Sequence, residues 1–372
     1  MMKKKKIVII ISLIAACTGL LNSQTMKYGF FRETDFISGF SMQSWSTSND
    51  KITEISIPVT IIVPVSKKLV INVGTSSAFA NLNSAENKLN GITDSRISAS
   101  YITLDDHLLI TGGVSIPTGK TTLEGDQSSV ASALAVYPLS FNVPSFGQGL
   151  ALNLAGIYAF KTGNFILGGG AGFVYKNGFK PSKDNDLKYQ PGSEISLNLG
   201  GETNANMRVP VKFTFDVTYT LYGADKYDGK DIFKSGGKLI ADLRSLFKVG
   251  QTDMVIFLRE RTKGKNEKGW GSLSTEDKNS NGNQIEAGYL AYIPTSEKFG
   301  IKGLVDLKLY SKNEYESNGA MIGGVGAGFN FMPTNHFGVE ILFKYSAGSL
   351  KNKDISTTVT GIEVGGGIKI RL

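Results

Sequence analysis

One uninterrupted alternation of apolar and polar residues constrains the fold of this chain more than any other feature of its sequence. Residues 209–222, VPVKFTFDVTYTLY, place Val209, Phe213 and Tyr219 on one face of an extended strand, and Lys212 and Asp216 on the other. A strand of this length exceeds the usual strand of a soluble sheet and suits a tilted strand that crosses a bilayer. Because lipid tolerates no unpaired strand edge, the pattern predicts a closed transmembrane β-barrel.

Similar segments recur along the whole chain and predict an all-β, antiparallel, up-and-down barrel of about 16 strands, although about 14 would also fit. We expect the strands at residues 36–46, 51–63, 68–80, 94–104, 107–117, 148–160, 164–176, 191–204, 208–222, 235–247, 251–262, 283–294, 298–311, 319–332, 337–347 and 357–372. Tight turns, such as 105–107 and 295–298, alternate with longer polar loops at 81–93, 118–147, 177–190, 223–234, 263–282 and 348–356. This arrangement is typical of outer-membrane barrels, with short periplasmic turns and long extracellular loops.

Composition favours one β-rich unit without helices. Glycine is abundant (44 residues) and proline is scarce (10 residues), and no part of the chain after its leading segment has a helical pattern. The formal net charge of +8 includes the lysines of the leading MMKKKK. The mild remaining excess is spread over many strands, which argues against nucleic acid as a partner. Outer-membrane lipid is the expected surrounding of the barrel.

The chain begins with the pattern of a secretory signal. After MMKKKK comes an apolar run, residues 7–21, that is too short for a comfortable membrane-spanning helix. We therefore expect a signal peptide at residues 1–23, followed by a single outer-membrane barrel at residues 24–372. An alternative remains open, because residues 13–17, LIAAC, resemble the lipobox before a lipidated cysteine. Cys17, the single cysteine, would then carry a lipid.

Aromatic residues and the final strand support the barrel independently. Phenylalanines such as Phe160, Phe165 and Phe337 flank the short turns, as in the aromatic girdle of outer-membrane barrels. The chain ends on GIEVGGGIKIRL, with Ile368 and Leu372 on one face. This ending resembles the strand that the barrel-assembly machinery recognises, although Leu372 stands where phenylalanine is commonest. A soluble β-sandwich or propeller is the alternative, but its strands would be shorter or would repeat as blades.

Several short motifs predict no cofactor, metal or catalytic site. Gly119-Lys120-Thr121 ends like a phosphate-binding loop, but Val114 replaces the first glycine and no amphipathic helix follows. Residues 277–282, DKNSNG, match half of a calcium loop whose twelfth position is Gly288 in place of glutamate. His107 and His336 are the only histidines, and both fall in expected periplasmic turns. Neither would reach an extracellular catalytic site, so we expect a protein that is not an enzyme.

Residues 101–122, YITLDDHLLITGGVSIPTGKTT, combine a strand, an aspartate-rich turn, a glycine-bearing strand and a Pro-Thr-Gly segment. This part of the chain resembles the transporter family named for the MetA pathway of phenol degradation, and the resemblance extends over about residues 95–250. Members of that family are similar to FadL-type channels, which carry aromatic or other hydrophobic compounds across the outer membrane. The resemblance implies a barrel that conducts such solutes. The leader here is too short for the N-terminal hatch of FadL.

Counting inward from the short turns places charged residues on the lumen face of the second half of the chain. The predicted lumen-lining residues are Lys212, Asp216, Arg244, Arg259, Glu286, Lys302, Asp306, Glu340, Lys344 and Lys369. The opposite wall is small and uncharged, with Gly168, Gly170 and Gly172 on one strand. These charges either pair across neighbouring strands because a wide lumen must be polar, or guide the anionic end of an amphipathic solute along a basic belt.

The expected function is therefore passive admission of small amphipathic, aromatic or hydrophobic solutes through an outer-membrane channel. The alternative is a non-conducting barrel that serves as a structural protein, adhesin or anchor.

Overall fold

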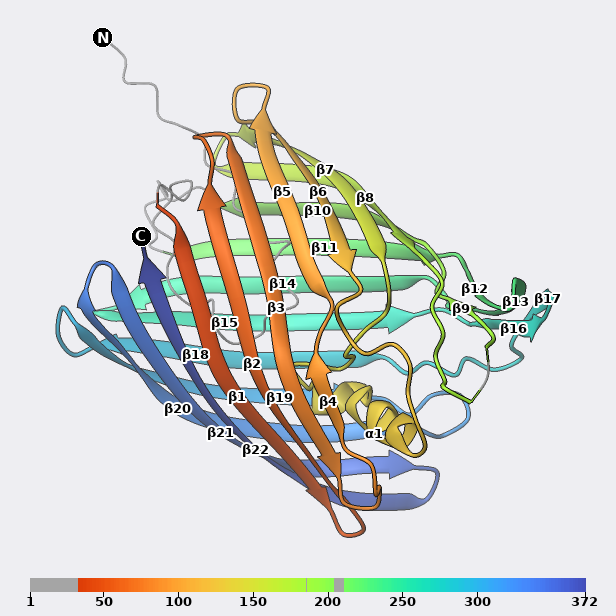
Figure 1. The fold of residues 1–372 in the computed structure, drawn as a ribbon. Helices are drawn as coiled ribbons and strands as arrows, with labels where there is room; N and C mark the ends of the chain where they lie inside the picture. The colour runs from red at the N-terminus through yellow and green to blue at the C-terminus, as the bar shows by residue number, and fades with distance from the viewer. Residues whose placement is uncertain (1–32, 185, 204–210) are drawn as a thin grey trace.

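The computed structural model describes residues 33–184, 186–203 and 211–372, and its strands form a closed antiparallel barrel (Figure 1). In chain order the barrel strands are β1 (Asp35–Thr47), β2 (Lys51–Pro64), β3 (Leu69–Leu82), β5 (Ser95–Thr103), β6 (Leu108–Ile116), β7 (Ala151–Thr162), β8 (Phe165–Lys176), β10 (Glu194–Thr203), β11 (Val211–Tyr222), β14 (Lys238–Val249), β15 (Thr252–Lys263), β18 (Gln284–Pro294), β19 (Phe299–Tyr310), β20 (Gly319–Thr334), β21 (Phe337–Asn352) and β22 (Ile355–Arg371). Val209, Cys17 and the expected signal peptide lie outside the described residues.

Each barrel strand pairs with the next in chain order, and the ring closes where β1 meets β22. That seam runs in one register from Asp35 opposite Arg371 to Thr47 opposite Val359. On its other edge β1 pairs with β2. The prediction of an all-β barrel of 16 strands is confirmed, and every expected segment corresponds to one of these strands.

The two faces of the barrel strands differ in polarity, as the sequence alternation predicts. On β11, Phe213, Tyr219 and Leu221 are exposed by 55%, 40% and 45%, whereas Thr220 on the other face is exposed by only 5%. Large apolar side chains are exposed in the same way on the other barrel strands, for example Leu154 on β7 and Val325 on β20. A closed barrel with an apolar outer surface is suited to hydrocarbon, so the chain is a multi-pass outer-membrane β-barrel.

The segment between β6 and β7, residues 117–150, folds into the barrel, and we call it the inward loop. It contains a helix, α1 (Gln127–Leu134), and a 3₁₀ turn, η2 (Tyr137–Leu139). The expectation of a chain without helices is therefore wrong, as is the expectation that 118–147 is a polar extracellular loop. Figure 1 shows α1 at one mouth of the barrel, and it contacts β2, β3 and the short strand β4 (Leu89–Ile92).

A buried apolar cluster explains why the inward loop turns inward. Six residues of the inward loop belong to it, each less than a tenth exposed: Val130, Leu134, Leu139, Phe141, Val143 and Phe146. Its wall members come from both ends of the chain and are Trp45, Ile52, Ala78, Ala80, Leu89, Ile322 and Val359. Burying such side chains stabilises the folded loop by roughly 1.5 to 3 kcal/mol for each large one.

Among the described residues, no helix is long and apolar enough to cross a membrane.

A second, smaller sheet extends from the barrel rim at the end opposite the described N-terminus (Figure 1). Its strands come from three long loops and are β9 (Tyr189–Gln190), β12 (Ala224–Tyr227), β13 (Lys230–Lys234), β16 (Glu267–Trp270) and β17 (Ser272–Thr275). The expected polar loops at 177–190, 223–234 and 263–282 are therefore structured. Residues 348–356, also expected to be a loop, mostly continue β21 and β22, whose pairing reaches Asn352 opposite Ile355.

Candidate functional site in the barrel lumen

The inward loop is closed at its base by one carboxylate. Asp94, just before β5, accepts hydrogen bonds from the backbone N–H of Gly119 (3.0 Å) and of Gln148 (2.7 Å). Gly119 also packs so tightly that an added Cβ would overlap the carbonyl oxygen of Phe146. Thr118 supports the same junction, since its Oγ1 donates to the carbonyl of Thr93 at 2.8 Å. The Pro-Thr-Gly segment is thus the anchor of the inward loop.

Polar contacts fix the underside of the inward loop to β1 and β2. The backbone N–H of Val143 donates to Glu54 Oε1 at 3.1 Å, and Glu54 is only 1% exposed. The backbone N–H of Asn142 donates to Gln43 Oε1 at 2.7 Å, while Gln43 Nε2 donates to the carbonyl of Ser140 at 3.2 Å. Because buried carboxylate and amide groups are costly without partners, these contacts hold the loop in one position.

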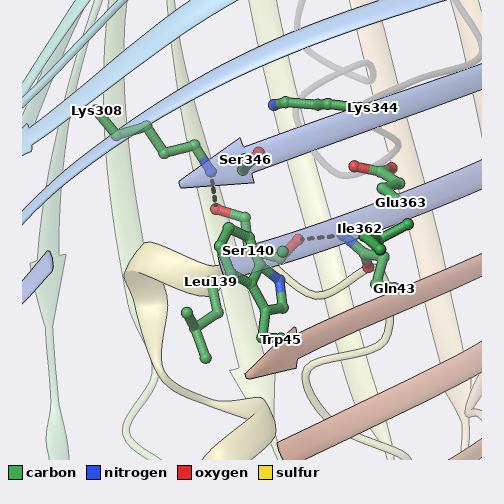
Figure 2. Close-up of a pocket in the computed structure, with 10 residues that line it drawn as sticks. Gln43, Trp45, Leu139, Ser140, Lys308, Lys344, Ser346, Ile362 and Glu363 are labelled. Carbon is green, nitrogen blue, oxygen red and sulfur yellow. Dashed lines mark hydrogen bonds between the residues drawn. The ribbon is translucent and has the colours of Figure 1, made fainter. Parts of the chain in front are cut away.

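The tip of the inward loop reaches the opposite part of the wall. The guanidinium carbon of Arg261, on β15, lies 4.0 Å from the ring centre of Tyr137. Tyr137 also meets the ring of Tyr310 edge-on, with 5.8 Å between ring centres. Figure 2 shows Lys308 of β19 extending to Ser140, whose Oγ it approaches at 2.7 Å. The loop therefore touches β1 and β2 on one side and β15 and β19 on another, and it restricts the lumen between them.

A cavity of about 30 Å³ remains beside this tip (Figure 2), enough for one water molecule. Its lining includes Trp45, Lys308, Lys344 and Glu363. Glu363 Oε1 is buried without a hydrogen-bond partner among the described residues. The tip therefore meets the wall through mixed polar and charged groups.

Nine of the ten predicted lumen residues take part in ion pairs. Within the predicted set, Lys302 pairs with Glu340 (2.7 Å), Lys344 with Asp306 (2.7 Å) and Arg259 with Glu286 (3.8 Å). The other cations pair outside the set: Lys212 with Glu202 (2.8 Å), Arg244 with Asp242 (2.6 Å) and Lys369 with Asp35 (2.9 Å). Asp216 accepts a hydrogen bond from Thr218 at 3.2 Å and lies opposite Asp242 in the strand register.

The acidic partners that the sequence interpretation missed follow the same parity as the predicted residues. Asp242 lies two positions before Arg244, so both side chains share one face of β14, and it also accepts Arg259 Nη2 at 2.8 Å. Glu202 lies near the end of β10, and Asp35 stood just outside the expected first strand. If the two-residue period is followed along the whole of each strand, ends included, it places Asp242, Glu202 and Asp35 on the same face as the predicted residues.

One ion pair spans an intervening strand through a glycine. Lys344 on β21 and Asp306 on β19 are separated by β20, where Gly324 stands opposite Asp306 in the register. A Cβ at Gly324 would fall within 2.5 Å of the Lys344 side chain and clash with Asp306 Oδ1. The missing side chain at Gly324 therefore leaves the space through which these two charges meet.

The middle of the wall formed by β8 and β10 offers small, uncharged groups, and charges on these strands lie towards their ends, where Lys176 pairs with Glu194 and Glu202 with Lys212. Gly168, Gly170 and Gly172 alternate with the exposed Phe173 and Tyr175 on β8, so they belong to the inner face. In the register, Gly170 lies opposite Asn198 and Gly172 opposite Ser196 of β10. Paired charges therefore run along β14, β15 and β18 to β21, whereas the middle of β8 and β10 has glycine, hydroxyl and amide groups.

The other sequence motifs have structural surroundings. His107 Nδ1 lies 2.7 Å from the carbonyl oxygen of Ala159, and His336 Nδ1 lies 3.3 Å from that of Arg371, both at short turns. Residues 277–282 belong to the segment after β17, where Asn279 Nδ2 donates to the carbonyl of Lys263. Within the described ranges, no group of three or more histidine, cysteine, aspartate or glutamate residues is arranged to hold a metal ion.

Glu276 anchors the loop that carries β16 and β17, outside the membrane-spanning strands. Although burial opposes it, hydrogen bonds from the backbone N–H groups of Asn266 and Ser280 and from the Ser280 hydroxyl lower the pKa of Glu276 from 4.5 to about 2. Lys268 lies 3.5 Å from the same carboxylate. A depressed pKa stabilises the folded loop above the unfolded value of 4.5, and this contribution is lost as the pH falls towards 2.

We expect acidification from pH 5 to about pH 2 to loosen the second sheet while the barrel stays folded. Trp270 on β16 reports this change, because Trp45 is the only other tryptophan and can be replaced by phenylalanine. Trp270 emission in the W45F protein should shift over that pH range, and the E276Q variant should show the loosened state already at neutral pH. Identical pH profiles for the two proteins would contradict the anchoring role.

Comparisons with known proteins support the architecture. No protein-family model and no curated protein matches the sequence. Among solved structures, the high-pH structure of Pseudomonas putida OprB is 12% identical, with a TM-score of 0.51 over 91% of this chain and 93% of that chain. A bacterial polysaccharide outer membrane secretin is 8% identical, with a TM-score of 0.50 over 92% and 99%. The CymD monoaromatic hydrocarbon channel is 10% identical, with a TM-score of 0.45 over 92% and 89%. At these identities the likeness to OprB and to the secretin shows a shared barrel fold.

Proposed function

We propose that this protein is an outer-membrane channel that passively admits small amphipathic, aromatic or hydrophobic solutes. The observation that carries the proposal is the two-sided lumen of a closed 16-strand barrel, with paired charges along one wall and small uncharged groups midway along β8 and β10 on another. A solute with an apolar body and a polar end would find a matching surface on each wall. The resemblance of residues 101–122 to the phenol-degradation transporters points in the same direction. The short-turn end would face the periplasm and the second sheet the exterior.

The inward loop gives this channel a defined constriction. Its base, underside and tip are each fixed by hydrogen bonds or ring contacts, so it narrows the lumen without depending on a mobile segment. Lumen charges that are paired and hydrogen-bonded keep the passage polar at a low desolvation cost. Their electrostatic field is strong in a low-dielectric pore and acts on passing solutes. Catalysis has no place in this proposal, because His107 and His336 serve the short turns.

A non-conducting barrel remains the second candidate, because the apolar cluster beneath the inward loop fills part of the interior. Conductance separates the two. Purified protein added to a planar bilayer should produce stepwise current increments, and liposomes containing it should take up small aromatic solutes faster than empty liposomes. Folding of the same sample is checked by heat-modifiable mobility on gels. A folded protein that gives neither current steps nor solute uptake would be a structural barrel, and the channel proposal would fail.

A further inference from the structure

Arg261 and Lys308 differ from the six predicted lumen cations, each of which pairs with a carboxylate, in the partners that hold them. Both are basic side chains of barrel strands, and both contact the inward loop. Arg261 is held by the Tyr137 ring and by Gln284, whose Oε1 accepts from Arg261 Nη1 at 3.2 Å. Lys308 donates to Ser140 Oγ at 2.7 Å and approaches the carbonyl oxygen of Pro138 at 3.5 Å. Among the described residues, neither cation has a carboxylate within ion-pair distance, whereas Arg259 and Lys344 each do.

Both cations keep hydrogen-bond donors for which the described residues supply no acceptor. A guanidinium carries five N–H donors in a planar fork that matches a carboxylate, and Arg261 gives one of them to Gln284. Lys308 has three donors and uses two of them, in a short contact to Ser140 Oγ and a long one to the carbonyl of Pro138. Polar groups of this kind that face a lumen need an acceptor, which water or an anion supplies.

The nearby carboxylates are mostly engaged elsewhere. Glu286 accepts the Tyr310 hydroxyl at 2.9 Å and faces Arg259 at 3.8 Å, and Asp306 pairs with Lys344. Glu363 and Lys308 line the same small cavity, but the Glu363 carboxylate does not lie within ion-pair distance of Lys308 Nζ. At the tip of the inward loop, two cations without an ion pair therefore face one carboxylate without an ion pair. The local balance favours an anion.

Aromatic side chains flank the same place. Tyr137 is 41% exposed, so part of its ring is open to the lumen even though Arg261 covers one side. Tyr310 stands edge-on to it and is nearly buried. An arene that carries a carboxylate could rest its ring on Tyr137 while its carboxylate accepts from Arg261 and Lys308.

We propose that Arg261, Lys308 and Tyr137 form a binding subsite for small aromatic carboxylates at the constriction made by the inward loop. This inference rests on the proposed channel function and narrows its solute class. It also moves the anion contacts away from Lys212, Arg244 and Lys302, each of which is already bound to a carboxylate. The subsite discriminates by charge and by ring together.

Equilibrium dialysis of the purified, folded protein against radiolabelled benzoate tests the subsite without requiring conduction. Benzoate should bind saturably, and benzyl alcohol and benzylammonium should not compete with it. The R261Q/K308Q double variant should bind benzoate at least about tenfold more weakly. R261K should bind benzoate more tightly than R261Q, because it keeps the positive charge. It should bind benzoate more weakly than the parent protein, because it loses the planar fork. Y137L should weaken benzoate more than acetate, since only benzoate uses the ring.

The matched control is K212Q, which removes one predicted lumen charge whose ion-pair partner is Glu202 of β10 and not a residue of the inward loop. It should leave benzoate binding unchanged, and all variants should keep heat-modifiable mobility. Unchanged binding in R261Q/K308Q, or an equal loss in K212Q, would overturn the subsite. The channel proposal stands or falls separately: current steps without benzoate binding contradict only the subsite, whereas benzoate binding by a barrel without current steps contradicts only conduction.

Discussion

Deletion of residues 367–372 is expected to abolish the folded barrel. These residues form the end of β22, where Gly39 to Asp35 of β1 pair with Gly367 to Arg371. Without them, residues 35–39 at the start of β1 would present unpaired backbone groups to lipid. Each such group costs several kcal/mol in hydrocarbon. Asp35, which is 1% exposed, would also lose its two cationic partners, Lys369 and Arg371. Leaving a buried charge without its partner costs roughly 3 to 5 kcal/mol.

The measurement is heat-modifiable mobility on gels together with resistance to protease. The full-length protein should show both properties and the truncated protein neither. L372F is the matched control, because Leu372 is 75% exposed and lies beyond the paired residues. It should fold as the parent does and, if this strand is read by the barrel-assembly machinery, should assemble at least as well in cells. A truncated chain that stays protease-resistant would show that the seam between β1 and β22 does not hold the barrel closed.

Replacement of residues 120–146 by a short flexible linker is expected to raise single-channel conductance severalfold. The inward loop contacts β1, β2, β15 and β19, so its removal clears the space between these walls. The barrel itself should remain, because its strand pairing involves none of the deleted residues. The deletion exposes apolar residues of the wall such as Trp45 and Ile322, which should lower thermal stability somewhat.

Conductance in planar bilayers measures this effect. A deletion of residues 267–275, which carry β16 and β17, serves as the control because it removes a similar kind of structured segment from outside the lumen. That deletion should change conductance little. Equal conductance of the parent and the inward-loop deletion would mean that solutes do not pass beside the loop.

The strands could be predicted from the sequence because each carries its own signal. Period-two alternation, as in β11, depends only on neighbouring residues and on a bilayer that requires one apolar face. The same parity groups Lys302, Glu340, Asp306 and Lys344 on one face of their strands, and the structure pairs them there. The missed partners, such as Asp242, were visible by parity but were not counted.

The inward loop could not be predicted in this way. Its apolar residues, such as Phe141 and Val143, have no regular period, and their partners include Ile322 and Val359, which are distant in the chain. The roles of Arg261 and Lys308 could not be predicted either, because strand alternation alone does not show that Tyr137 and Ser140 of the inward loop contact them. The five-stranded second sheet joins three loops, so no single loop carries its signal.

The composition of the apolar cluster beneath the inward loop determines when the loop can dock during folding. Its wall residues include Trp45 from the first barrel strand and Val359 from the last, which become neighbours only when β1 pairs with β22. The Asp94 junction at the base of the loop needs only strands that are close in the chain. The loop can therefore contact Ile52, Ala78 and Leu89 as soon as β2 to β4 are in place, whereas its contacts with Ile322 and Val359 need the closed ring. Closure of the ring accordingly completes the apolar cluster, so the seam between β1 and β22 also stabilises the docked loop.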